Sequence, residues 1–230
     1  MYWLSKDLVF PDPQYASKEG LLAAGGDLSP QRLLLAYQHG IFPWYNEGEP
    51  ILWWSPDPRF VLYPSAIKIS KSMRRVLKKG AFELRFDTAF EEVLENCANI
   101  KREGQEGTWL IPEMQAAYQK LHYYGFAHSV ETWQDGVLVG GVYGLALGQC
   151  FFGESMFAKV SNASKVALIG LAQQLQKRGF KLIDCQAETK HLASMGATFI
   201  KRDTFLEVLE ENRTHPTPRE TWTHWGEASK

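Results

Sequence analysis

The strongest hydrophobic periodicity in the chain is helical and runs from Ser70 to Gly80. Ser70 can cap this segment and Gly80 can end it. Met73, Val76 and Leu77 fall on one side of such a helix. The other side carries five basic residues at i, i+3, i+4, i+7 and i+8, namely Lys71, Arg74, Arg75, Lys78 and Lys79. The pattern predicts an amphipathic helix whose polar face bears only positive charge.

Helical periods with start and stop signals predict six further helices. Ser29 and Pro30 mark the start of the first, and Tyr37 belongs to its apolar face. Thr88 and Glu91 form a capping-box pattern at the start of the second. A polar loop that contains glycine is expected at 101–107. The predicted helices cover residues 30–40, 90–100, 112–125, 162–178 and 203–212, with a short one near His191.

After Gly125 the period changes to alternation, which predicts strands. Residues 127–133 and 137–147 flank Asp135 and Gly136, a strong hairpin-turn pair. Further strands are expected at 149–157, 181–186 and 198–201. Between residues 42 and 59 the prolines argue against a long helix or a central strand. The tryptophans of that stretch form either a lid over the core or the wall of a pocket.

These elements predict an α+β protein. A mainly antiparallel sheet built from hairpins is followed by alternating helices and strands. We expect a small irregular N-terminal domain at residues 1–62 and a larger domain at 63–230. The polar tail after residue 213 is either a strap or a loose end.

Composition narrows the classes of function. The net charge of −1 predicts no general attraction to nucleic acid, so any such binding needs a local basic patch. The basic helix supplies one, although a solvated helix face is the usual explanation of such a stripe. Three cysteines without C-x-x-C spacing argue against disulfides and a zinc site. No secretory or membrane-spanning stretch is found, so a cytoplasmic location is expected.

Three polar residues in two apolar strands are the candidates for chemistry. Asp184 and Gln186 flank Cys185, so they share one face of an extended strand. Glu154 is the one carboxylate in an aromatic strand. Each has an ordinary alternative, because Asp184 can be a solvated strand end and Glu154 can be exposed by alternation. If buried, these groups require hydrogen-bond partners.

Several motifs together resemble the bacterial leucyl/phenylalanyl-tRNA–protein transferases, in order along the chain from about Gly25 to Arg202. They are GGDLS at 25–29, GIFPW at 40–44, WWSPDPR at 53–59, EGTWL at 106–110, AHSVE at 127–131, GGVYG at 140–144, FGESMF at 152–157, NASK at 162–165 and LIDCQ at 182–186.

The resemblance implies transfer of Leu, Phe and, less readily, Met from aminoacyl-tRNA to proteins with N-terminal Arg or Lys, which marks them for degradation. It implies a GNAT-like acyltransferase domain, no metal, no further cofactor and a monomer. Asp184 and Gln186 would be catalytic, and Glu154 would attract the cationic acceptor. Trp44 and Trp109 would stack on the terminal adenine or line the pocket. The basic helix would hold the tRNA acceptor stem, and the donor side chain would enter an apolar cavity formed by Val142, Leu168, Leu171 and Ile183.

Two other classes of function stay open. A coenzyme-A-dependent GNAT N-acetyltransferase would share the fold, but residues 158–162 contain no glycine for a pyrophosphate loop. A noncatalytic RNA-binding module would explain the basic helix but not Asp184, Gln186 and Glu154 together.

Overall fold

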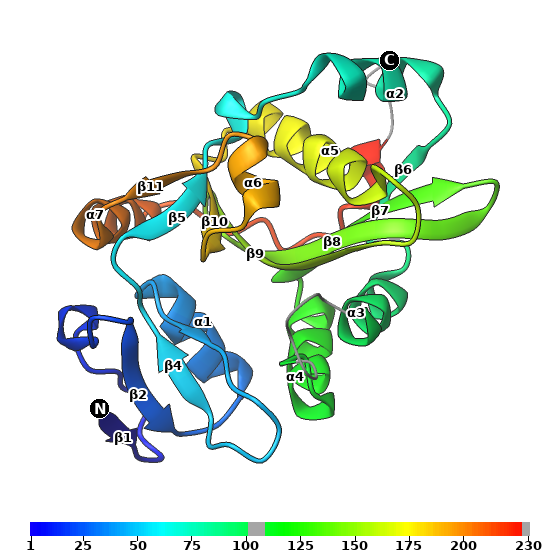
Figure 1. Cartoon of the computed structure of the whole chain (residues 1–230). Coiled ribbons are helices and arrows are strands. Elements are labelled where there is room, and N and C mark those ends of the chain that lie inside the picture. The colour runs from blue at the N-terminus through cyan, green and yellow to red at the C-terminus, as the bar shows by residue number, and fades with distance from the viewer. Residues whose placement is uncertain (101–108, 227–230) are drawn as a thin grey trace.

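The computed structural model describes residues 1–100 and 109–226 and contains two β-sheets (Figure 1). The smaller sheet has the order β1-β2-β4-β3. Its strands are β1 (Tyr2–Leu4), β2 (Leu21–Gly25), β3 (Phe42–Pro43) and β4 (Leu52–Trp54). Helix α1 (Pro30–Gln38) connects β2 to β3, and the Ser29 hydroxyl caps it by accepting the Arg32 N–H. The region expected to be irregular therefore contains a short sheet and a capped helix.

The larger sheet has seven strands in the order β11-β5-β10-β9-β8-β7-β6. All neighbouring pairs are antiparallel except β9 and β10. The strands are β5 (Arg59–Leu62), β6 (Glu83–Phe86), β7 (Ala127–Gln134), β8 (Val137–Leu147), β9 (Cys150–Ala158), β10 (Leu182–Gln186) and β11 (Thr198–Ile200). The α+β prediction is confirmed.

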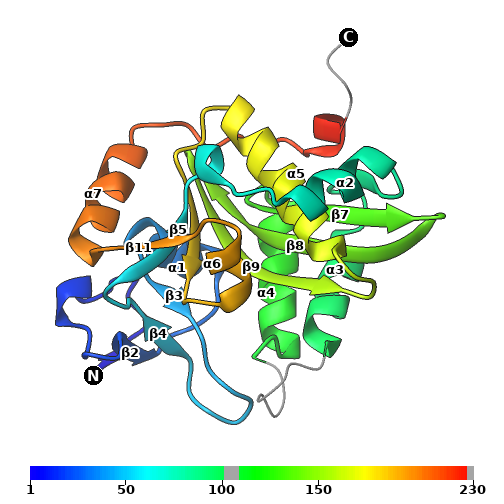
Figure 2. The ribbon, with the colours of Figure 1, turned by 45° about the horizontal axis from the view of Figure 1, so that its top comes forward.

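Helices cover both faces of the large sheet (Figure 1). Helix α5 (Ala163–Lys177) packs on one face, and α2 (Lys71–Lys79) lies alongside it (Figure 2). Helices α3 (Phe90–Asn99) and α4 (Pro112–Tyr123) cover the other face, where α1 joins their apolar core. Helices α6 (Lys190–Ser194) and α7 (Arg202–Asn212) flank β11 in the chain. No helix among the described residues is long and apolar enough to cross a membrane.

Strand β5 changes the expected division of the chain. It begins at Arg59, directly after Pro58, and lies between β11 and β10. The expectation that the prolines exclude a central strand is wrong, because β4 (Leu52–Trp54) lies between β2 and β3 and β5 lies inside the larger sheet. Neither strand contains a proline; Pro58 directly precedes β5 and removes no hydrogen bond within it. Since β5 belongs to the large sheet, we propose a boundary near residue 58 rather than 62.

Two further local predictions have clear outcomes. The hairpin forms with Asp135 and Gly136 both at positive φ, as a type I′ turn requires. The capping box does not form: Ala89 is the N-cap residue of α3 and makes no side-chain cap. Glu131 of β7 takes the place expected of Glu91, because its carboxylate accepts the Thr88 backbone N–H at 3.4 Å and the Thr88 hydroxyl at 2.9 Å. The loop expected at 101–107 lies outside the described residues.

The C-terminal tail is a strap. Trp222 and Trp225 are buried, and their rings stack with centroids 3.8 Å apart. Trp222 also stacks on His128, while the Arg178 guanidinium lies 3.9 Å from the Trp225 ring. The Trp222 backbone N–H donates to Asp87. These contacts fasten the tail to the α5 side of the large sheet.

Candidate functional site

The candidate site lies where the two parallel strands of the large sheet stop pairing. Strand β10 pairs with β9 as far as Asp184, opposite Phe152, while β9 continues to Ala158. Glu154 and Gln186 come directly after this point on their strands. The register of β10 against β5 shifts at the same place. Polar side chains are thus placed at the carboxyl ends of a parallel pair, where sheets with helices on both faces commonly bind ligands.

Glu154 is partly buried and is held by side chains from two helices and one strand. Tyr37 of α1 donates to its Oε1 at 2.8 Å, and Tyr118 of α4 donates to its Oε2 at 2.7 Å. The Gln186 side-chain NH2 donates to Oε1 at 3.1 Å. The two phenol oxygens are themselves 2.7 Å apart. Three residues far apart in the sequence thus fix one carboxyl group.

The triangle formed by Glu154, Tyr37 and Tyr118 fits a protonated carboxyl group. Its three oxygen–oxygen contacts need three protons, and the two phenols supply only two. Burial raises the pKa of Glu154 to about 7, and the negative charge of Asp184 also raises it, while the tyrosine hydrogen bonds and Arg59 lower it. Burial likewise raises the pKa of both phenols well above the ordinary value, so they stay protonated. Near neutral pH, Glu154 is therefore divided between its two forms.

Asp184 is fully buried and forms a two-pronged ion pair with Arg59. Arg59 Nε donates to Oδ1 at 2.8 Å, and Nη2 donates to Oδ2 at 2.7 Å. The solvated strand end considered from the sequence is thus ruled out. Asp184 Oδ1 also accepts the backbone N–H of Gln186 at 2.9 Å. Asp184 therefore holds the Gln186 main chain, whereas the side-chain amide of Gln186 is held by Glu154.

The direction of the Gln186 amide follows from these contacts. Glu154 Oε1 serves as an acceptor in both protonation states, because the proton of the neutral acid can lie on Oε2 and donate to Tyr118. The Gln186 NH2 group must then face Glu154, and the carbonyl Oε1 points away from it. Within the described part of the chain, that carbonyl oxygen accepts no hydrogen bond. It is available to a donor on a bound molecule.

The two tryptophans chosen from the sequence lie in different surroundings. Trp109 is buried and meets the Tyr118 ring edge to face, with centroids 6.5 Å apart, so it lies one side chain away from Glu154. Trp44 is 48% exposed, and its described ring contact is with Trp54. Trp109 can shape the site through Tyr118, while Trp44 offers an open ring face for stacking.

The four residues expected to line an apolar cavity share one core. All are at most 2% exposed and belong to the cluster between α5 and the large sheet; they are Val142, Leu168, Leu171 and Ile183. Neither the cavity described below nor a second one of about 270 Å³ is lined by any of them. Entry of a side chain among these residues would require the core to open.

The basic helix α2 forms as predicted, capped by Ser70 and ended by Gly80 in a left-handed conformation. Met73 is buried on its inner side. The outer side is exposed, and no ion pair within the described residues involves its basic members, which are Lys71, Arg74, Arg75, Lys78 and Lys79. The charge of this face is not neutralised by the protein's own acids.

Three site residues escaped the sequence reasoning. Tyr37 was assigned to an apolar helix face, although a buried phenol usually needs a hydrogen-bond partner. Arg59 occurs in a quoted motif without a role, and Tyr118 was not singled out. Arginine is almost never fully buried unless paired, but no pattern in the sequence indicated that Arg59 is buried, because the prolines before it argued against a central strand. No group of three or more His, Cys, Asp or Glu side chains among the described residues could hold a metal ion.

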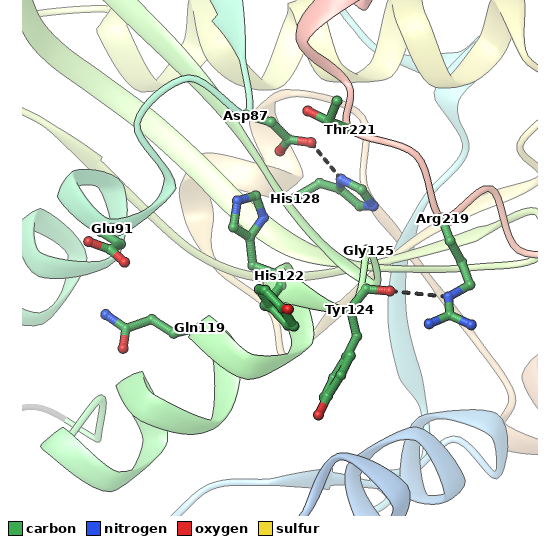
Figure 3. Close-up of a pocket in the computed structure, with 10 residues that line it drawn as sticks. Asp87, Glu91, Gln119, His122, Tyr124, Gly125, His128, Arg219 and Thr221 are labelled. Carbon is green, nitrogen blue, oxygen red and sulfur yellow. Dashed lines mark hydrogen bonds and ion pairs between the residues drawn. The ribbon is translucent and has the colours of Figure 1, made fainter.

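A cavity of about 700 Å³ lies elsewhere, between the end of α4 and the tail (Figure 3). His122, His128 and Arg219 line it, together with Asp87, whose carboxylate accepts from His128 Nδ1 at 2.8 Å. None of the site residues chosen from the sequence takes part in it. The site around Gln186 is therefore defined by its hydrogen bonds and not by this cavity.

Comparison with known proteins identifies relatives over nearly the whole chain. The family model described as leucyl/phenylalanyl-tRNA protein transferase matches residues 61–210, and the model of its N-terminal domain matches residues 26–57. The leucyl/phenylalanyl-tRNA–protein transferase of Syntrophobacter fumaroxidans is 54% identical over 96% of this chain and 95% of its own length. The protein of the same name from Flavobacterium johnsoniae is 58% identical over 91% of this chain and 99% of its own length.

Solved structures similar to this chain include N-acetyltransferases. A ribosomal-protein-alanine N-acetyltransferase from Brucella melitensis biovar Abortus 2308 is 16% identical, with a TM-score of 0.36, over 50% of this chain and 85% of that one. A GCN5-related N-acetyltransferase from Kribbella flavida is 13% identical, with a TM-score of 0.35, over 74% of this chain and 60% of that one.

Proposed function

Because the chain belongs to the leucyl/phenylalanyl-tRNA protein transferase family, we propose that it transfers leucine, phenylalanine and, less readily, methionine from aminoacyl-tRNA to proteins that begin with arginine or lysine. Aminoacyl transfer from tRNA to protein is the activity that the family's name states. We extend it to these acceptors and to marking them for N-end rule degradation in the cytoplasm. We propose that the enzyme acts as a monomer and needs no further cofactor.

The carbonyl oxygen of Gln186, which accepts no hydrogen bond from any described residue, is the observation that carries this proposal. The donor is an activated ester, and the acceptor amine has an ordinary pKa of about 7.7–8.0, so a fair fraction is neutral near pH 7. Such an amine needs positioning more than a strong base. Gln186 Oε1 can accept a hydrogen bond from the amine and direct its lone pair at the ester carbon.

The proposed reaction conserves its atoms without an external reagent. The amine nitrogen bonds to the ester carbonyl carbon, and the bond from that carbon to the terminal ribose oxygen of the tRNA breaks. The proton lost by the amine passes, by way of Gln186 or directly, to the departing ribose oxygen. An amide and a free ribose hydroxyl are the products. Asp184 contributes by holding the Gln186 main chain.

Glu154 has two roles in this proposal. It holds the Gln186 amide, and it supplies negative charge for an arginine or lysine side chain of the acceptor. An incoming cation favours the ionised form, because an opposite charge lowers the pKa of a carboxyl group. Acceptor binding would thus increase the fraction of Glu154 that is ionised near neutral pH.

The tRNA would bind through the outer face of α2. Its five basic side chains suit phosphates and provide no reading of sequence, which matches a carrier recognised through its acceptor stem. We propose that Trp44 and Trp109 stack on the terminal adenine or shape the pocket wall. We also propose that the donor side chain enters next to Val142, Leu168, Leu171 and Ile183.

One incubation tests the proposed function. The protein is mixed with Phe-tRNA and a peptide that begins with Arg, and mass spectrometry should find one added phenylalanine at the N-terminus. A peptide of the same sequence beginning with Glu is the matched control and should stay unmodified. Acetyl-CoA in place of Phe-tRNA should give no product. Acetylation, or no transfer from Phe-tRNA, would overturn the proposal.

A further inference from the structure

Arg59 is the most completely enclosed cation near the site. It is 1% exposed, and its guanidinium lies between the rings of Phe42 and Phe205, at 4.8 and 4.7 Å from their centroids. Nη1 donates to the Gly40 carbonyl at 3.2 Å. Nε and Nη2 both donate to Asp184. The N-terminal part, α7 and strand β10 thus all contact this one side chain.

The shape of Arg59 matters as well as its charge. Taking two charges out of water is costly, and only good geometry with additional hydrogen bonds offsets that cost. The flat guanidinium matches both carboxylate oxygens and both aromatic faces at once. A lysine ammonium would keep the charge but could not hold Asp184 in this plane or stack between two rings. Arg59 therefore fixes the orientation of the Asp184 carboxylate.

That orientation reaches Gln186 through a single atom. Asp184 Oδ1 accepts both Arg59 Nε and the Gln186 backbone N–H, at 2.8 and 2.9 Å. Gln186 has a φ of +55°, a left-handed conformation that is unfavourable for a non-glycine residue. The hydrogen bond from its N–H offsets this cost at the point where the register of β10 shifts. The conformation aims the Gln186 side chain toward Glu154.

We propose that Arg59 is a positioning residue for aminoacyl transfer, which holds Gln186 in its left-handed conformation through Asp184 and so directs the Gln186 carbonyl at the acceptor amine. This inference rests on the proposed function of Gln186. Arg59 does not touch the reacting atoms. Its contacts with Gly40 and Phe42 also make the geometry of Gln186 depend on how the N-terminal part packs.

The test compares Arg59→Lys with Arg32→Lys. Arg32 is a matched control because it is also fully buried, donates to a backbone carbonyl and pairs with an acid, but lies in the N-terminal part with Asp27. We expect Arg59→Lys to lower kcat by about 10- to 100-fold, the cost of a small misplacement, with the acceptor KM changed less than twofold. Arg32→Lys should lose stability without loss of kcat per folded molecule.

A double-mutant cycle with Gln186→Ala separates positioning from folding. If Arg59 acts through Gln186, Arg59→Lys should cost almost nothing further in a Gln186→Ala background. Additive losses, or full kcat in Arg59→Lys, would overturn the inference. If Arg59→Lys does not fold, Phe205→Leu is tested instead, because it removes one of the two aromatic rings that enclose the Arg59 guanidinium. Phe205→Leu should lower kcat by about threefold or more when Gln186 is present, and should have almost no effect in the Gln186→Ala background. An unchanged kcat of the Phe205→Leu protein would also overturn the inference.

The same cycle distinguishes this inference from the proposed function. A wild-type protein that transfers nothing, or a Gln186→Ala protein with full rate, contradicts the proposed role of Gln186. A Gln186→Ala protein that loses rate beside a fully active Arg59→Lys protein contradicts only the role of Arg59.

Discussion

Glu154→Gln should change how the stability of the protein depends on pH. The pKa of Glu154 is about 7 in the folded protein, against an ordinary value of 4.5. Between these values the folded state holds a proton that the unfolded state has released. The free energy of unfolding therefore decreases as pH rises. The contribution is complete below about pH 4.5 and is lost by about pH 7.

The magnitude follows from the shift. A difference of about 2.5 pKa units at 1.36 kcal/mol each gives about 3 kcal/mol. Glutamine mimics the neutral acid, because its NH2 group can donate to Tyr118 while its carbonyl accepts from Tyr37 and Gln186. At pH 5 the variant and the wild type should therefore be about equally stable. At pH 8 the variant should be more stable by up to about 3 kcal/mol.

Urea unfolding at pH 5, 6, 7 and 8, followed by tryptophan fluorescence, measures this difference directly. Other groups also titrate, but they do so in both proteins, so the difference between the two curves isolates Glu154. Glu95→Gln replaces an exposed glutamate and is the matched control, for which the difference should stay constant with pH. If the free energies of unfolding of Glu154→Gln and the wild type also differ by a constant amount from pH 5 to 8, the pKa of Glu154 is not raised in the folded protein.

Further outcomes are expected from the same site and fold. Glu154→Gln should raise the KM for Arg- and Lys-led peptides several-fold in steady-state kinetics, with a smaller effect on kcat. Asp184→Ala and Gln186→Ala should each strongly reduce single-turnover transfer and combine less than additively, and Gln186→Glu should lose activity at pH 7 if the neutral carbonyl is what matters. Trp222→Ala should lower the free energy of unfolding, measured by urea denaturation, by about 3–5 kcal/mol, because it leaves a cavity where the buried indole stacks between His128 and Trp225. A variant of α2 with alanine at four basic positions should bind tRNA more weakly and with a flatter salt dependence. It should still use a minimal aminoacyl-adenosine donor normally. The four positions are Lys71, Arg74, Arg75 and Lys78.

Local patterns predicted most of the elements because each carries its own signal. Strands β7 and β8 follow from alternation on either side of Asp135 and Gly136, and α2 follows from Ser70, Gly80 and a helical period. The capping box at Thr88 failed where a tertiary contact competed with a local one. The carboxylate of Glu131, from a different element, accepts the Thr88 N–H that the local pattern assigned to Glu91.

The sequence pointed to three residues of the candidate site but not to the contacts that join them. The resemblance named Asp184, Gln186 and Glu154 as functional residues, and Asp184 and Gln186 were expected to share one face of an extended strand. Their real arrangement depends on the bulge after Asp184, which is set by pairing with β5. Arg59 is 125 positions before Asp184, so no pattern within one segment could join them.

The N-terminal part contributes hydrogen bonds that help to hold the carboxylates of this site. Tyr37 from α1 holds Glu154, and Arg59, one residue beyond the proposed boundary, holds Asp184 while bonded to Gly40. The larger sheet brings the strands of the site together, but the contacts that fix both carboxylates come partly from the first 59 residues. The smaller unit is therefore packed near the point where β9 and β10 separate, and it helps to hold the two carboxylates that contact Gln186.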